Sequence, residues 1–260
     1  MTALLTATPA AFTTATVDVV ALLPLLIVFG GALLGVLVEA FVPRASRFQT
    51  QVVLTVVVLV GALVALAVGA VNHRGTTAGT AGSDGILRGA VVIDGPALFI
   101  QSIILLFALL AVFTYAERLG GVGSDTFTPM GAAVPGSARE AEALRAGAMT
   151  AEVFPLFLFS VAGMMLFPSA GDLLTMFVAL EVLSLPLYIM CGLSRRRRLL
   201  SQEASLKYFL LGAFSSAFFL FGVALLYGYA GSVYLPAIAA AISSPVAGLG
   251  GLLVPGILLI

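Results

Sequence analysis

Long uninterrupted runs of apolar residues are the feature that most restricts the fold of this chain. A helix that crosses the hydrocarbon core of a bilayer needs about 20 mostly apolar residues, at a rise of about 1.5 Å each. Of the 260 residues, 61% are hydrophobic and 9% are charged, and the mean hydropathy is +1.17. We therefore predict an all-α, polytopic membrane protein with six complete transmembrane helices, at residues 18–40, 50–71, 96–116, 150–168, 171–193 and 204–230.

A seventh apolar run begins at Gly250 and reaches the last residue, Ile260. A run of this length rises only about 16 Å, half of the hydrocarbon thickness, so we interpret the sequence as an N-terminal fragment of a longer protein. Pro255 and Gly256 lie inside this run, as in the broken helices of transporter ion sites. We divide the chain into an N-terminal bundle of three helices (1–120), a flexible cytoplasmic connector (121–149) and a second helical region (150–260).

Arginines are unevenly shared between the two sides of the predicted spans. The first, third and fifth connections carry nine basic residues, the second carries two and the fourth carries none. Cytoplasmic loops of membrane proteins are enriched in Lys and Arg. We therefore predict that the odd connections, including the arginine-rich loop 194–203, are cytoplasmic and that the N-terminus lies outside. The nine residues are Arg44, Arg47, Arg118, Arg139, Arg145 and Arg195 to Arg198, and the two are Arg74 and Arg88.

Several classes of function find no support in the sequence. The formal net charge is zero, which indicates no nucleic-acid partner. The single cysteine, Cys191, excludes a disulfide within the chain, and the single histidine, His73, lies in a predicted loop. The chain has no phosphate-binding loop, nucleophile triad or metal-ligand cluster, so we expect no catalytic, cofactor-binding or metal-binding residue.

Two ionisable residues lie inside predicted spans, where a charge is costly. Glu181 is in the middle of the fifth span and Lys207, the only lysine, is near the start of the sixth. A charge near the bilayer centre costs roughly 2.5–3.5 kcal/mol on insertion scales, so an intramembrane acid and base indicate a functional site. Counted from the cytoplasmic helix ends, Glu181 lies about 18 Å deep and Lys207 about 13 Å deep. We therefore predict that they lie at similar depth and form a buried pair.

Such a pair suits proton translocation. A lysine beside a carboxylate keeps its proton, whereas burial without a partner favours the neutral amine. A carboxylate that approaches and withdraws would make Lys207 bind and release a proton. Glu203, four residues before Lys207, offers a competing partner at favourable helical spacing, and Lys207 also has the length to reach the surface. The sequence leaves open whether Lys207 pairs with Glu181 or Glu203.

Other polar residues near the pair are candidates for supporting roles. Pro186 is expected to kink the fifth helix and free a backbone carbonyl, which suits a polar cavity. Ser184, one turn from Glu181, and Ser215, near the Lys207 face, are expected to hold water. Asp172 is expected to cap the fifth helix, after a tight turn at 168–171, and Glu39 to reach the cytoplasmic interface.

The region around these charges resembles a known family. Residues 171–232 contain the motif Asp172-Leu-Leu-Thr-Met-Phe-Val-Ala-Leu-Glu181-Val-Leu-Ser184-Leu-Pro186-Leu-Tyr188, then Glu203-Ala-Ser-Leu-Lys207-Tyr208-Phe-Leu-Leu-Gly212-Ala-Phe-Ser215-Ser216, then Phe221-Gly222-Val-Ala-Leu-Leu-Tyr227-Gly228. These motifs resemble subunit N of bacterial NADH:quinone oxidoreductase, respiratory complex I.

The resemblance implies an antiporter-like fold of about fourteen helices with inverted repeats, of which 150–260 would be the incomplete first repeat. It implies that Glu181 and Lys207 are the glutamate and lysine of proton translocation, in a non-redox subunit that is not catalytic alone. It implies other membrane subunits of complex I and membrane lipids as partners, in the bacterial plasma membrane. Flavin, iron–sulfur clusters and quinone are expected in other subunits, and no cofactor in this chain.

Two other functions fit the same residues. One is a subunit of a multi-subunit cation/proton antiporter, which shares the fold and the use of a glutamate and a lysine. The other is a structural scaffold subunit whose buried charges only fix the register of the helices.

Overall fold

The structure is a computed structural model that describes residues 19–43, 46–72, 89–116, 127, 134, 136–145, 151–194, 198–244 and 250–260. Within these ranges the β pairings are isolated bridges and every regular element is helical, which confirms the predicted all-α fold. The helices are α1 (Val19–Phe41), α2 (Arg47–Asn72), α3 (Gly95–Ala116), α4 (Ala138–Arg145), α5 (Val153–Leu166), the 3-10 turn η2 (Phe167–Ser169), α6 (Leu173–Leu193), α7 (Arg198–Ala230), α8 (Leu235–Ser243) and α9 (Gly250–Leu259).

Five of the described helices, α1, α2, α3, α6 and α7, are long and apolar enough to cross a membrane. They correspond to five of the six predicted spans, so the chain is a multi-pass membrane protein. The remaining predicted span, 150–168, corresponds to α5 continued by η2, and its apolar stretch Val153–Ser169 is shorter than the other five. That α5 also crosses the membrane stays a prediction.

Helix α7 begins earlier than predicted. It starts at Arg198 instead of residue 204 and runs for 33 residues. The segment before the predicted start contains Leu199, Gln202 and Glu203, which are good helix formers. The prediction used hydropathy, which locates the start of the apolar run at residue 204 and gives no signal for the polar turns of α7 that precede it.

Two short helices were not predicted. Helix α4 lies within the predicted connector 121–149, and its sequence AREAEALR consists of strong helix formers. Helix α8 has a proline in its first turn, where the fixed backbone angle of proline suits a helix start. Both are far shorter than the window of about 20 residues that defines a membrane span. The expected start of a seventh helix in the run from Gly250 is found as α9, which continues through Pro255.

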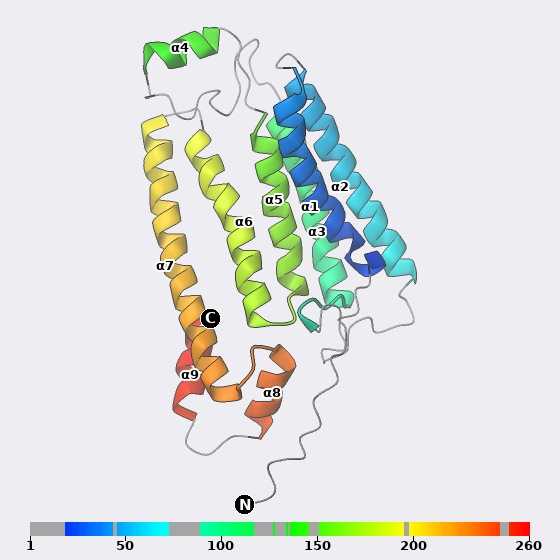
Figure 1. The fold of residues 1–260 in the computed structure, drawn as a ribbon, viewed down its shortest axis with the longest axis vertical. Coiled ribbons are helices and arrows are strands. Elements are labelled where there is room, and N and C mark those ends of the chain that lie inside the picture. The colour runs from blue at the N-terminus through cyan, green and yellow to red at the C-terminus, as the bar shows by residue number, and fades with distance from the viewer. Residues whose placement is uncertain are drawn as a thin grey trace, which may run out of the picture.

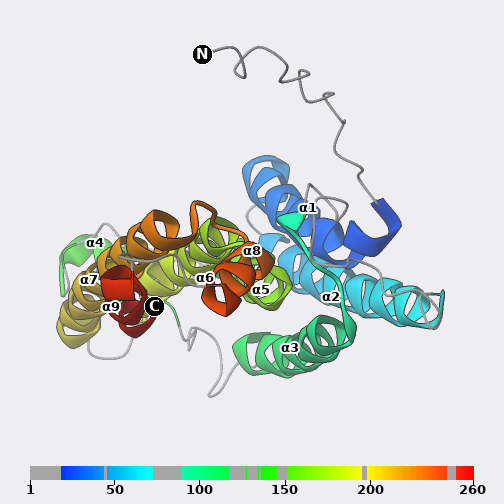
Figure 2. The same cartoon turned by 90° about the horizontal axis from the view of Figure 1, so that it is seen from below.

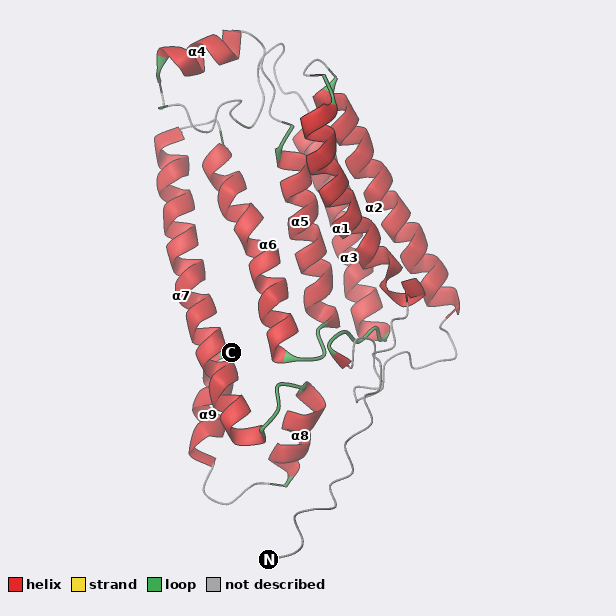
Figure 3. Ribbon diagram, viewed as in Figure 1, coloured by secondary structure: helices red, strands yellow, loops and turns green. Residues whose placement is uncertain are grey.

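The long helices run in alternating directions (Figure 1). The C-terminal ends of α1, α3 and α6 lie at the same end of the molecule as α4, and the C-terminal ends of α2, α5 and α7 lie at the opposite end, as does α8 (Figure 3). This alternation agrees with the predicted alternation of the connections. It brings Arg47 of α2 and Arg139 of α4 to one end of the bundle.

Helix α5 lies between two groups of helices (Figure 2). On one side it packs against α6, which in turn packs against α7, and on the other side it packs against α1, α2 and α3. Helix α7 also contacts α8 and α9. The candidate charged residues therefore lie in the α6–α7 half of the molecule, away from the three N-terminal helices.

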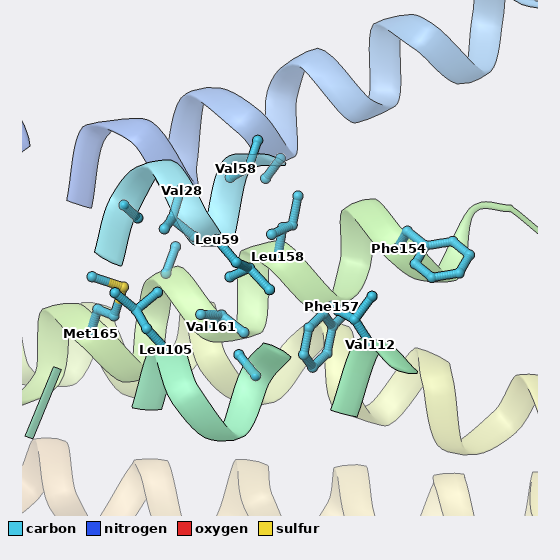
Figure 4. Close-up of a cluster of buried hydrophobic side chains, with 14 of the residues drawn as sticks. Val28, Val58, Leu59, Leu105, Val112, Phe154, Phe157, Leu158, Val161 and Met165 are labelled. Atoms are coloured by element: carbon cyan, nitrogen blue, oxygen red, sulfur yellow. The ribbon is translucent and has the colours of Figure 1, made fainter. Parts of the chain in front are cut away.

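The main apolar core joins α5 to the three N-terminal helices (Figure 4). Small residues such as Ala32, Ala62 and Ala162 are fully buried there, and small side chains allow helices in membranes to approach closely. This packing fixes α5, and therefore fixes the surface on which α6 lies. The labelled side chains of the cluster are Val28, Val58, Leu59, Leu105, Val112, Phe154, Phe157, Leu158, Val161 and Met165.

A tight turn between α5 and α6 sets the start of α6, as predicted. Gly171 donates its N–H to the carbonyl of Ala90 at 2.8 Å, and a Cβ at Gly171 would overlap the carbonyl of Gly89. Asp172 then caps the helix: its carboxylate accepts hydrogen bonds from the N–H of Thr175 at 2.7 Å and from the Thr175 hydroxyl at 2.9 Å. The predicted N-cap is confirmed, and it fixes the position of Glu181 along α6.

Candidate functional site

The carboxylate of Glu181 lies at the contact between α6 and α7. Its Oε1 accepts a hydrogen bond from the hydroxyl of Ser216, with 2.5 Å between the oxygens, and the side chain is half-buried. Glu181 follows the Asp172 cap by about 13 Å along the helix axis. A hydroxyl donor partly compensates the cost of burying a carboxylate. The α6–α7 contact therefore holds a half-buried carboxylate whose partner is a hydroxyl.

The ammonium group of Lys207 forms an ion pair with Glu203, one turn earlier on α7. The side chains of Lys207 and Glu203 are 68% and 54% exposed. Of the two partners left open by the sequence, the structure therefore selects Glu203. The predicted buried contact between Lys207 and Glu181 is not formed in this structure.

Helix geometry explains why Lys207 does not meet Glu181. Ser216 follows Lys207 by nine residues. At 3.6 residues per turn, nine residues correspond to two and a half turns, so the two side chains leave α7 on opposite faces, about 13 Å apart along the axis. Because Ser216 contacts Glu181 on α6, Lys207 faces away from α6.

The register of α6 against α7 corrects the predicted depths. Ser205 donates a hydrogen bond to the carbonyl of Tyr188 at 2.6 Å, and the rings of Tyr188 and Tyr208 meet edge to face with centroids 4.5 Å apart. Lys207 thus lies level with Tyr188, which is two helical turns, about 10 Å, from Glu181. The prediction counted depth from Leu193 and from Arg198 and treated these two helix ends as level, whereas side-chain packing sets the real register.

The side chains on α7 that contact α6 form a regular row. Ser205, Gly212, Ser216 and Phe219 follow one another at spacings of seven, four and three residues. A Cβ at Gly212 would overlap the hydroxyl of Tyr188, so Tyr188 packs directly on the backbone of α7. The ring of Phe219 stacks on Phe177 with centroids 6.2 Å apart. This spacing is typical of two helices packed along a common seam.

Three of the four predicted supporting residues, Ser184, Pro186 and Ser215, lie outside the hydrogen bond of Glu181 and the ion pair of Lys207. The hydroxyl of Ser184 donates to the carbonyl of Leu180 on its own helix, at 2.5 Å. Pro186 is buried within α6, which continues through it, and Ser215 is exposed on α7. The predicted water-holding roles of Ser184 and Ser215, and the predicted kink and free carbonyl at Pro186, stay predictions. The fourth residue, Glu203, is the partner of Lys207.

Ser216 is the contact of Glu181 that sequence reasoning missed. The prediction named its neighbour Ser215, because Ser215 lies near the face of the helix that carries Lys207. The sequence does contain a signal: Ser205, Gly212 and Ser216 form a row of small residues at seam spacing, and such rows mark close helix contacts in membranes. Ser215 lies outside that row.

A second polar cluster ties α1 to α2. Glu39 accepts a hydrogen bond from Arg47 at 3.4 Å and another from the amide of Gln51 at 3.2 Å. The same Gln51 amide donates to the carbonyl of Gly35 at 2.7 Å. Glu39 lies at the helix end where it was predicted to reach the interface, and these partners hold its partly buried carboxylate between the two helices.

The described part of the chain contains no group of three or more His, Cys, Asp or Glu residues that could hold a metal ion. Cys191 is exposed near the end of α6. Other residues singled out in the sequence, including His73, lie outside the described residues. The remaining ones are Arg44, Arg74, Arg88, Arg118, Arg195, Arg196 and Arg197.

The chain is similar to a known family of membrane proteins and to named relatives. Residues 170–260 match the family described as NADH:quinone oxidoreductase/Mrp antiporter, TM. NADH-quinone oxidoreductase subunit N 3 of Streptomyces griseus is 55% identical over 227 residues, which cover 85% of this chain and 40% of that protein. NADH-quinone oxidoreductase subunit N of Rhodococcus opacus is 56% identical over 239 residues, which cover 85% of this chain and 42% of that protein.

A solved structure agrees with these relatives. A chain in the structure of respiratory complex I from Thermus thermophilus superposes with a TM-score of 0.58 and 30% sequence identity, over 90% of this chain and 42% of that chain. The chain thus spans about two fifths of the length of the curated relatives it matches. The matched family region contains Glu181, Lys207 and Ser216.

Proposed function

We propose that this chain, a member of the NADH-quinone oxidoreductase subunit N family, forms part of a proton-translocating membrane subunit of respiratory complex I. In this proposal the subunit transfers protons and has no redox centre of its own. Flavin, iron–sulfur clusters and quinone belong to other subunits, and this chain is not catalytic alone. The chain contributes residues that bind and release protons inside the membrane.

The carboxylate of Glu181 carries the proposal. It is held at the contact between two apolar helices by a hydroxyl, and the ion pair formed by Lys207 lies elsewhere on α7. Moving one charge against 100 mV requires about 2.3 kcal/mol. Placing a charge at mid-membrane costs roughly 2.5–3.5 kcal/mol. The two energies are of similar size, so a change in the partners of Glu181 has the right magnitude to be coupled to the uptake or release of one proton.

Lys207 is proposed as a second station in the same pathway. With Glu203 it lies about 13 Å from Ser216 along α7, toward the end of the bundle where α4 lies. We propose that protons pass between the two stations through water and hydroxyl groups. A direct contact between Glu181 and Lys207 is not required in the state that the structure describes.

The proposed setting is the bacterial plasma membrane, with other membrane subunits of complex I and lipids as partners. The end of the bundle that carries α4 and the start of α7 would face the cytoplasm, together with loop 194–203. This orientation is supported by the arginines of the odd connections, which membrane insertion retains on the cytoplasmic side.

The test is Glu181→Gln in the full-length subunit, assembled in complex I in inside-out membrane vesicles. Glutamine keeps the shape of the side chain and cannot exchange a proton, so NADH-driven proton uptake should fall by about tenfold or more. Uptake is measured with a pH-sensitive dye, and assembly by the amount of subunit in the purified complex. Glu142→Gln is the matched control, because Glu142 is an exposed carboxylate on α4.

Normal proton uptake per NADH oxidised in Glu181→Gln would contradict the proposal. A loss of assembly with unchanged uptake per assembled complex would instead favour the scaffold function.

A second candidate function is a subunit of a multi-subunit cation/proton antiporter. It is favoured by the matched family, whose description includes the Mrp antiporter. The same vesicles distinguish the two functions. An antiporter subunit moves protons after a pulse of sodium ions in the absence of NADH, whereas a complex I subunit moves them only during NADH oxidation.

A further inference from the structure

We infer that Ser216 is the positioning residue for Glu181: its hydroxyl holds the carboxylate at the α6–α7 contact and remains a hydrogen-bond partner in both protonation states. This inference rests on the proposed function, in which Glu181 takes up and releases a proton. Nothing in the family description or the relatives' names assigns a role to this serine. The contact itself is the hydrogen bond from Ser216 Oγ to Glu181 Oε1.

The chemistry of the hydroxyl suits this role better than that of an ammonium group. A serine hydroxyl has one donor and two acceptor lone pairs, whereas a lysine ammonium only donates. When Glu181 is ionised, the Ser216 hydroxyl donates to the carboxylate. When Glu181 gains a proton, the hydroxyl turns and accepts the new O–H. No proton is lost or gained by Ser216, and neither state leaves the carboxyl group without a partner.

The position of Ser216 is fixed by its neighbours along the seam. One turn further along α7, Phe219 stacks on Phe177 of α6. One turn earlier, Gly212 lies directly against the ring of Tyr188. Both contacts prevent rotation of α7 about its axis while the seam is closed. Ser216 therefore stays directed at Glu181 without any movement of its own backbone.

The surroundings make the hydrogen bond effective. Phe177 lies one turn before Glu181 on the same helix, and Phe219 is buried. With Leu173 and Val223 they belong to an apolar cluster that borders the site on the side of α8. Hydrogen bonds are stronger in such a low-dielectric setting, and an unpaired polar group costs more there. Loss of the Ser216 hydroxyl should therefore have a measurable effect on the carboxyl group of Glu181.

The neighbouring serine provides a matched control. Ser215 has the same side chain on the same helix but is exposed, and the hydrogen bond to Glu181 comes from Ser216. Ser215→Ala and Ser216→Ala remove the same atoms one residue apart. A general effect of lower polarity in α7 would appear in both variants, whereas a positioning role would appear only in Ser216→Ala.

The experiment measures the vibration of the Glu181 carboxyl group directly, in complex I containing the full-length subunit. Infrared difference spectra taken during a pH titration contain the C=O stretching band of protonated Glu181, identified by its loss in Glu181→Gln. In Ser216→Ala this band should move in frequency, because the carboxyl group loses a hydrogen bond. In Ser216→Thr, which keeps the hydroxyl, and in Ser215→Ala the band should stay at the wild-type position.

A second readout links this contact to pumping. Because Ser216→Ala removes a hydrogen bond to the carboxylate, NADH-driven proton uptake in this variant should fall by about tenfold. The pH at which uptake is half-maximal should also be displaced, and Ser216→Thr should restore both properties. Ser216→Cys, with a weak donor of similar size, replaces the alanine variant if that variant does not assemble.

The outcomes separate this inference from the proposed function. An unmoved Glu181 band in Ser216→Ala or Ser216→Cys overturns the positioning role, whatever Glu181→Gln does to pumping. An equal movement of the band in Ser215→Ala also overturns it. A displaced band together with normal pumping in Glu181→Gln confirms the contact and refutes the proposed function of Glu181.

Discussion

At the scale of single residues, the two charged groups have different partners: Glu181 accepts a hydrogen bond from Ser216 across the α6–α7 contact, and Lys207 pairs with Glu203 on its own helix. Glu181 and Lys207 stand out because ionisable residues are rare in apolar helices. Which serine faces Glu181 depends on the rotation of α7, and one residue changes the direction of a side chain by about 100°. Ser215 was predicted to hold water near Lys207, whereas Ser216 is the serine that contacts Glu181. The choice of Glu203 as the partner of Lys207 needed only local spacing, and the sequence could name it.

The cap of α6 leads to a residue-scale prediction. Asp172→Ala removes both hydrogen bonds to Thr175, so it should lower the free energy of unfolding by about 1 kcal/mol. The measurement is thermal unfolding of the full-length subunit in detergent. Asp172→Asn keeps an acceptor for the N–H of Thr175 and should lose less stability. Equal losses in the two variants would show that the charge, and not the cap, is what stabilises this turn.

At the scale of elements, the sequence predicted the long helices well and the short ones poorly. Apolar runs of about 20 residues are specific to membrane spans, and α1, α2, α3, α6 and α7 are all found where they were expected. Helices α4 and α8 have eight and nine residues, too few for any periodic signal to be distinguished from a loop. The start of a seventh helix was expected in the run from Gly250, and α9 forms there and continues through Pro255.

The contact between α5 and α6 leads to an element-scale prediction. A Cβ at Gly163 would lie 2.8 Å from the Cα of Leu183, so Gly163→Ala must push the two helices apart. The expected cost is about 1–3 kcal/mol, as for other overpacked sites. Separation of these helices should also reduce NADH-driven proton uptake, because α6 carries Glu181. Stability is measured by thermal unfolding in detergent, and proton uptake with a pH-sensitive dye in inside-out vesicles.

Gly30→Ala is the matched control for this prediction. Gly30 lies within α1, and a Cβ at this position would meet nothing within 4 Å. Alanine is the better helix former by about 1 kcal/mol, so this variant should unfold at the wild-type temperature or above it. A similar loss of stability in both variants would contradict the close contact of α5 and α6.

At the scale of the whole molecule, alternation of the helices could be predicted, but the packing could not. The number and order of apolar runs determine that successive spans cross in opposite directions, and Figure 1 shows this alternation. The central position of α5 and the row of contacts between α6 and α7 depend on side-chain shape across different helices. Composition contains no information about which faces meet. The predicted similar depth of Glu181 and Lys207 failed for this reason.

The orientation of the molecule is the prediction at this scale. In a full-length subunit that carries Cys191→Ser, a single new cysteine is placed at Glu142 or at Ser244, both exposed and at opposite ends of the bundle. A membrane-impermeant thiol reagent should label Ser244→Cys in intact cells and Glu142→Cys only after the cells are opened. The reverse pattern would show that the arginine-bearing end faces outward.

The length and rigidity of α7 have a consequence for any exchange of partners at Glu181. One unbroken helix of 33 residues carries the hydroxyl of Ser216 on one face and the ammonium group of Lys207 on the other. Because these two groups project from opposite faces of one helix, neither rotation nor sliding of α7 as a rigid body brings both of them to the same carboxylate at once. If Lys207 replaced Ser216 as the partner of Glu181, the whole of α7 would have to move. Helix shifts of this kind take microseconds to milliseconds, whereas a rotamer change takes nanoseconds.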